Sequence, residues 1–127
     1  MGKYNPDFDL DLSFGEHYED ALAKILKLGK VEVKTERDIW YSTKNIVIEY
    51  EYKGNPSGIK KTKADYWAII LTLEGRIKAI IIFEVKVLRD LLKNLLLEGK
   101  LELIKGGDNN DSSMMRVPLR ELLINKL

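Results

Sequence analysis

Two carboxylates and a lysine alternate along one short stretch of the sequence, NIVIEYEYK, at residues 45–53. Because side chains of a β-strand alternate between its two faces, we expect Glu49, Glu51 and Lys53 on one face and Ile48 and Tyr50 on the other. A charged face of this kind is usually just solvated. Neighbouring carboxylates repel each other, however, and a bound Mg²⁺ would relieve that repulsion. The stretch is therefore either a solvated strand face or a metal-binding strand.

The preceding segment, LGKVEVKTE, alternates in the same way and places Glu32, Lys34 and Glu36 on one face. The connection to the next strand is short, so we expect the two strands to pair antiparallel. That pairing would gather four carboxylates around one lysine. An ammonium group beside carboxylates can orient an attacking water and neutralise a phosphoryl group. The combination is suited to hydrolysis of a phosphodiester.

The rest of the chain predicts helices and further strands that would position these residues. Ser13 and Glu16 form a capping box for a helix that ends before Gly29, and a Leu-rich helix ends at Gly99. ADYWAIILTL and RIKAIIIFEV predict two strands in the sheet interior, joined by a tight turn, and Pro118 begins a closing helix. This order predicts an α+β (mixed α/β) fold in which helices flank a central mixed β-sheet.

Length and composition narrow the function classes. A chain of 127 residues is most simply a single domain, residues 1–127. The absence of cysteine and the single His17 exclude thiolate catalysis and cysteine-based zinc sites. With 21 Lys and Arg against 20 Asp and Glu, any basic surface must be local. No apolar run is long enough for a membrane span, so we expect a soluble cytoplasmic protein with no membrane partner.

The chain resembles the PD-(D/E)XK nuclease superfamily, in particular small phage-type nucleases and archaeal-type Holliday junction resolvases. The family pattern has a glutamate on the first helix, often as G-x-x-x-E, then an acid near the end of one strand, then an acid-x-Lys on the next. Gly15 and Glu19 fit the first element, Glu36 fits the second, and Glu49 with Glu51 fits the third. Two further segments, SGIKKTKADYW at 57–67 and the GGD-to-Pro segment at 106–118, also look like parts of such nucleases.

The resemblance implies a restriction-endonuclease-like core and a metal-dependent DNA endonuclease, most simply a structure-selective resolvase in phage or archaeal DNA recombination. One or two Mg²⁺ or Mn²⁺ ions would be held by Glu36 and Glu49, with help from Glu19 and the main-chain carbonyl of Tyr50. Lys34 would orient the attacking water. A homodimer is expected, because a resolvase cuts two strands symmetrically.

DNA contacts are expected from the basic loop that follows the charged strand. They come from Ser57, Lys60, Lys61 and Lys63. Lysines of this kind grip phosphates without reading the base sequence. Trp40 and Tyr41 are expected to be exposed aromatics, whereas Tyr66 and Trp67 are expected in the core.

Two departures from the family pattern leave alternatives open. Glu51 stands where a lysine is usual, so Lys53 would serve if the motif is Glu51-Tyr52-Lys53. Asp38 competes with Glu36 for the second position. The set we expect is Glu36, Glu49 and Glu51 with Lys34.

A further register takes Glu32-Val33-Lys34 as the acid-x-Lys motif. The preceding strand acid would then come from Asp9 or Asp11.

The alternative function is a non-catalytic DNA- or protein-binding module on a decayed nuclease fold. This module would use a Leu-rich helix at 88–97, which is either buried or a dimer contact.

Overall fold

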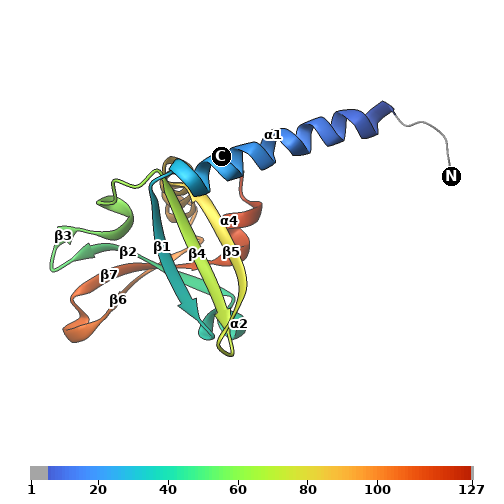
Figure 1. Ribbon diagram of the computed structural model, residues 1–127. Helices are drawn as coiled ribbons and strands as arrows, with labels where there is room; N and C mark the ends of the chain where they lie inside the picture. Colours follow the sequence, from blue (N-terminus) through green and yellow to red (C-terminus); the bar gives the residue numbers. More distant parts are fainter. Residues whose placement is uncertain (1–5, 127) are drawn as a thin grey trace. The chain divides into compact units, whose positions relative to one another are not determined.

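The computed structural model describes the backbone of residues 6–126 and the side chains of residues 12–126. The chain divides after Lys30 into two compact units, each described by itself. The first contains one helix, α1 (Pro6–Leu28) (Figure 1). This helix begins earlier than the capping box predicts, and Asp9 and Asp11 lie within it rather than in a strand. Within residues 6–126, no helix combines the length and apolar character that a membrane crossing requires.

The second unit contains two sheets, and the first of them has three strands in the order β1-β4-β5 (Figure 1). β1 (Val31–Arg37) runs parallel to β4 (Tyr66–Leu73), which pairs antiparallel with β5 (Arg76–Glu84). The turn between β4 and β5 is Glu74-Gly75, with φ of 51° and 78°. Positive φ at both positions is the two-residue hairpin geometry that glycine favours, so the predicted tight turn is confirmed.

The second sheet has four antiparallel strands in the order β3-β2-β7-β6. β2 (Asn45–Tyr52) is the charged stretch, and β3 (Asn55–Pro56) is its short hairpin partner. β7 (Ser112–Pro118) follows β6 (Glu102–Gly106) through a 3-10 turn, η2 (Asp108–Asn110). We did not predict β7 as a strand, because its first residues are serines that belong to a turn-like run. In the fold these serines, Ser112 and Ser113, are buried.

The expected antiparallel pairing of the two charged strands is wrong. β1 pairs with β4 and β2 pairs with β7, so the two strands lie in different sheets. A short helix, α2 (Ile39–Thr43), connects them, and the residues that flank it, Asp38 and Lys44, have φ of 35° and 62°. The Asp38 N–H donates to the Thr72 carbonyl at 3.1 Å. The connection is therefore a turn from one sheet to the other and not a hairpin.

The core is built from apolar residues of both sheets and from α3 (Val85–Leu97). The Leu-rich helix contributes Leu88, Leu91, Leu92 and Leu95, all buried. Trp67 is buried as expected, but Trp40 is buried too, with 8% exposure, and its indole N–H donates to the Thr72 carbonyl at 2.6 Å. The expectation of an exposed Trp40 is therefore wrong.

The remaining helical elements of the second unit are η1 (Gly58–Lys60) and α4 (Leu119–Ile124), which begins after Pro118 as predicted. The α+β class is confirmed. The strands are divided between two sheets, however, rather than gathered in one central mixed sheet. β4 is the central strand of its sheet, whereas β5 lies at the edge, so only the first of the two apolar segments is interior.

Candidate functional site

Glu32 and Lys34 lie on the side of β1 that shares a face with Trp67 and Ile69 of β4. The Lys34 ammonium is 4.0 Å from the Glu32 Oε2 atom and 5.6 Å from the centre of the Trp67 ring. Both charged side chains keep much of their surface in solvent, with 49% and 40% exposure for Lys34 and Glu32. A pair so long and so accessible is weak. Both groups are therefore available to a ligand.

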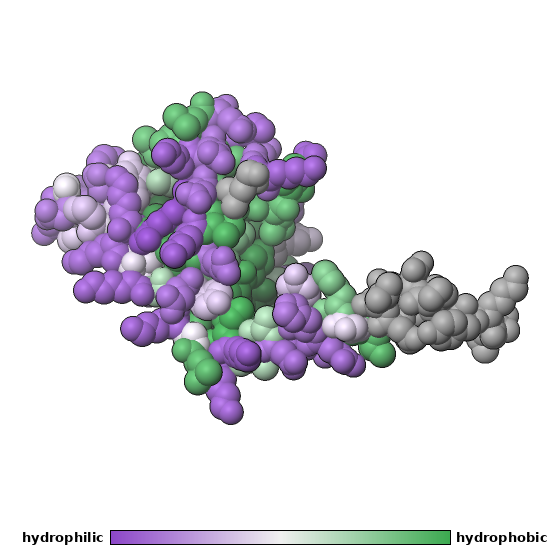
Figure 2. All heavy atoms as spheres, turned by 90° about the horizontal axis from the view of Figure 1, so that it is seen from above, coloured by the Kyte–Doolittle hydropathy of each residue, from purple (hydrophilic) through white to green (hydrophobic). Residues whose placement is uncertain are grey.

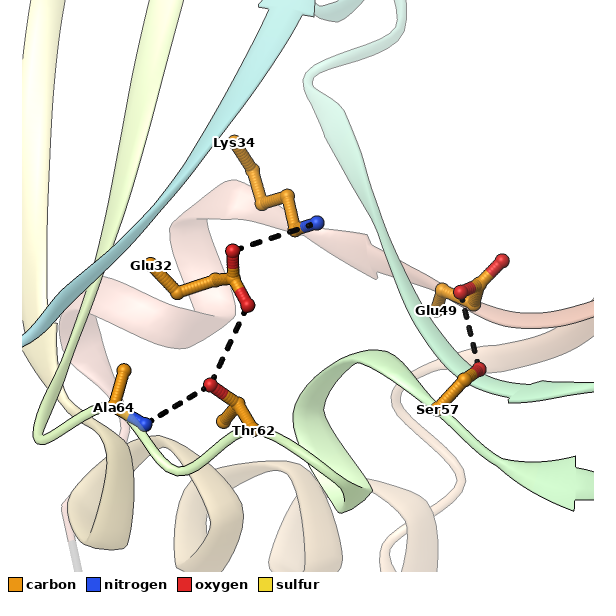
Figure 3. A network of polar contacts seen from close by, with 6 residues as sticks. All are labelled: Glu32, Lys34, Glu49, Ser57, Thr62 and Ala64. Atoms are coloured by element: carbon orange, nitrogen blue, oxygen red, sulfur yellow. Dashed lines mark hydrogen bonds and ion pairs between the residues drawn. The ribbon is translucent and has the colours of Figure 1, made fainter.

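Glu49 lies on β2, in the other sheet, across from this pair in the view of Figure 3. Figure 3 shows the Lys34 ammonium pointing from β1 toward the side of β2 that carries Glu49. The Ser57 hydroxyl donates a hydrogen bond to the Glu49 Oε2 atom at 3.0 Å. This bond orients a half-buried carboxylate at the start of the loop that follows β3.

The same loop reaches the other carboxylate through Thr62. The Thr62 hydroxyl lies 3.5 Å from the Glu32 Oε1 atom and accepts a hydrogen bond from the Ala64 N–H at 3.2 Å (Figure 3). Residues 57–64 therefore contact Glu49 at one end and Glu32 at the other. We call this segment the 57–64 loop.

The 57–64 loop packs directly on the backbone of β2. The Ser57 N–H donates to the Tyr50 carbonyl at 2.9 Å. Gly58 has a φ of +52°, and a Cβ added there would lie 2.1 Å from the Glu49 carbonyl oxygen. Glycine is required at this position because a side chain would both strain the backbone and collide with Glu49.

Arg89 of α3 holds the 57–64 loop from the other side. Its Nε atom donates to the Ile59 carbonyl at 2.8 Å, and its Nη2 atom donates to the Thr62 carbonyl at 3.0 Å. Ile59 itself is 2% exposed and belongs to the core. Sequence reasoning missed Arg89; its only signal was a lone arginine within a Leu-rich helix.

Glu36 has a different environment from the one its expected role requires. Its Oε1 atom accepts a hydrogen bond from the Val47 N–H at 3.0 Å, which links β1 to β2 between the two sheets. Burial raises the pKa of the Glu36 carboxyl, and the hydrogen bond from Val47 opposes that rise. This carboxylate is occupied in holding the two strands together.

Two other expected site residues are also paired with protein groups. The Glu51 carboxylate lies 3.5 Å from the Lys60 ammonium, and the Tyr50 carbonyl accepts the Ser57 N–H. A β-bulge between Glu49 and Glu51 breaks the regular alternation that would have kept these side chains in one row. In the part of the chain that the structure describes, no three acidic or histidine side chains converge as a metal-binding group.

Two of the alternates, Asp38 and Lys53, lie outside the 57–64 loop. Asp38 accepts a hydrogen bond from the Glu74 N–H at 3.1 Å, beyond the far end of β1. Lys53 lies in the β2–β3 turn with a φ of 50°. Glu19 is exposed on α1, in the separate first unit, and its role as a ligand stays a prediction.

The structure thus brings Glu32, Lys34 and Glu49 around the 57–64 loop, where Lys60, Lys61 and Lys63 are exposed. Two carboxylates that contact one basic loop, one of them beside an ammonium, have the chemistry to bind a hydrated divalent cation and a phosphate group. Comparison of the chain with protein-family models, with curated proteins and with solved structures finds no match.

Proposed function

We propose that this protein is a Mg²⁺- or Mn²⁺-dependent endodeoxyribonuclease that acts as a homodimer on branched DNA in the manner of a Holliday junction resolvase. The observation that carries the proposal is the arrangement of Glu32, Lys34 and Glu49 around one loop with exposed lysines. A solvated strand face would not need hydroxyl groups that orient each carboxylate. Here Thr62 and Ser57 contact the two carboxylates separately.

The donor chemistry fits a magnesium ion. Mg²⁺ binds through one or two carboxylates and keeps several positions for water and for substrate phosphate. Glu32 and Glu49 are the residues that would hold it. The bound ion would supply positive charge for the scissile phosphate and would lower the pKa of a coordinated water.

In this assignment Glu32-Val33-Lys34 supplies the acid-x-Lys motif, and the second acid is Glu49 instead of Asp9 or Asp11, which lie in α1. Glu36 was the residue we expected in the ligand set, but its carboxylate accepts the Val47 N–H and is partly withdrawn from solvent. Glu32 is 40% exposed and lies beside Lys34. Glu49 also belongs to the set first expected from the sequence, together with Glu36 and Glu51.

The chain's own groups have distinct tasks in this proposal. Lys34 places an ammonium beside the acidic groups, where it orients the attacking water and neutralises charge that develops on the phosphate. Lys60, Lys61 and Lys63 hold the DNA backbone without base specificity. Ser57 and Thr62 keep the two carboxylates in place.

The test is a cleavage assay with labelled four-way junction, duplex and single-stranded DNA, in Mg²⁺ and in EDTA. We expect metal-dependent cleavage with preference for the junction. Glu49→Gln and Glu32→Gln should abolish it, and Lys34→Met should lower the rate by about a hundredfold or more. Glu102→Gln is the matched control, because Glu102 contacts Arg116 on β7 and not the 57–64 loop.

The same assay distinguishes Glu32 from Glu36 as the metal ligand on β1. Glu36→Gln should retain cleavage if Glu32 is the ligand and should lose it if Glu36 is. Full activity of Glu49→Gln would refute both. Absence of cleavage of every DNA in Mg²⁺ and in Mn²⁺, together with salt-dependent DNA binding that weakens when the loop lysines are removed, would favour the non-catalytic module.

A further inference from the structure

β5 is an unusually long edge strand for a small sheet. It spans nine residues, Arg76–Glu84, and has a strand partner on one side only among residues 6–126. Typical strands have about five or six residues. Its backbone donors and acceptors on the free side form a ready template for another strand.

β5 exposes two large apolar side chains, together with the charged residues Arg76, Lys78 and Glu84. Ile77 and Ile80 are 62% and 54% exposed. Hydrophobic side chains reach the surface among hydrophilic ones on the face drawn in Figure 2. The strand contains no proline, and its one bulge lies at Lys78, opposite the Leu71–Thr72 step. The stretch from Ala79 to Glu84 is therefore regular and open.

The apolar stripe of the Leu-rich helix is buried in the core, because Leu88, Leu91, Leu92 and Leu95 are at most 4% exposed. Only Leu96 and Leu97, in the last turn of α3, are exposed leucines of this helix. The resolvase-like function proposed above needs a second copy of the chain, and the free edge of β5 is a surface that could bind it. A dimer formed there rests on that function, but it can be tested without nuclease activity.

We propose that β5 pairs antiparallel with β5 of a second copy, about a two-fold axis at Ile81. In this register Ile80 lies opposite Ile82 of the second copy, and Lys78 lies opposite its Glu84. The symmetry repeats each pair, as in any isologous interface. Opposite charges and β-branched residues are the cross-strand pairs that stabilise antiparallel strands.

The charge pattern selects this partner and this register. A lysine on an edge strand normally deters pairing. Here Lys78, at the bulge, and Glu84 lie three residues before and after Ile81 in the sequence, so each lysine meets a glutamate when two copies pair. Ile80 and Ile82 share the face of the sheet that points away from Trp67 and Ile69. The result is one continuous sheet, β4-β5 of one copy followed by β5-β4 of the other.

The first test is sedimentation equilibrium of the full chain and of two matched variants. Ile80→Lys places a charge beside Ile82 of the second copy, and it should raise the dimer dissociation constant about tenfold or more because the change occurs twice per dimer. Val33→Lys is the control: Val33 is 51% exposed on the same face of the same sheet, but it belongs to β1. It should leave the dimer unchanged.

The second test exchanges the charges and does not depend on a hydrophobic substitution. Lys78→Glu alone and Glu84→Lys alone should each weaken the dimer, and the double variant should restore it. A chain that is monomeric at every concentration would overturn the inference. So would a dimer that Ile80→Lys leaves intact, or one that the double charge exchange fails to restore while circular dichroism shows a folded protein.

Discussion

Gly58→Ala should destabilise the second unit, because it acts on the contact between the 57–64 loop and β2. Gly58 has a φ of +52°, which costs an alanine about 1–2 kcal/mol. The added Cβ would lie 2.1 Å from the Glu49 carbonyl oxygen, which belongs to the backbone and cannot rotate away. The loop must shift, at a cost of about 1–3 kcal/mol typical of overpacking. The total is about 2–5 kcal/mol.

The assay is urea denaturation followed by far-UV circular dichroism, with Gly54→Ala as the matched control. Gly54 has a φ of +80°, but an added Cβ there meets nothing within 4 Å. This control therefore has the backbone strain without the collision. Gly58→Ala should lose about 1–3 kcal/mol more than Gly54→Ala, equivalent to a fall in Tm of several degrees, roughly 4 °C or more. Equal losses in the two variants would refute the close packing of the loop on Glu49.

Two further predictions concern buried polar groups. Trp40→Phe removes the hydrogen bond to the Thr72 carbonyl, whereas Trp67→Phe removes an indole N–H that has no partner among the described residues. In urea denaturation, Trp40→Phe should therefore lower the free energy of unfolding by about 1 kcal/mol more than Trp67→Phe does. A larger decrease for Trp67→Phe would contradict this reasoning. Burial raises the pKa of Glu36 above 4.5, so the native state holds this proton more tightly than the unfolded chain does. The stability that Glu36 contributes is therefore fully present below pH 4.5 and is lost as the pH rises through the native pKa. Across this pH range, the free energy of unfolding of Glu36→Gln should increase relative to that of the wild type. A difference between the two proteins that does not change with pH would contradict this prediction.

The elements with strong local signals could be predicted from the sequence. The leucine spacing in α3 and the Glu74-Gly75 turn each specify a structure through neighbouring residues, and both are confirmed. The alternation in β1 and β2 correctly predicted two strands. β7 could not be recognised, because burial of Ser112 and Ser113 depends on strands β2 and β6 on either side of it.

The candidate site, too, could be predicted from the sequence only in part. Glu49, Lys34 and the basic loop were among the residues expected from the sequence, and Glu32 was an alternate. The choice between Glu32 and Glu36 could not be made from alternation, because both lie on the same face of β1. The choice depends on the hydrogen-bond partners of the two carboxylates. Glu36 accepts from the Val47 N–H and Glu32 contacts Thr62, and both partners come from other segments of the chain.

The sequence by itself determined which residues carry charge, the helical or extended character of the segments with strong periodicity, and that any phosphate-binding surface must be local. Only the tertiary structure decided that β1 and β2 belong to different sheets, that the 57–64 loop contacts both Glu32 and Glu49, and that Arg89 holds this loop. The physical reason is that strand alternation specifies the face on which a side chain lies, whereas the partner of a strand is set by long-range packing around the core.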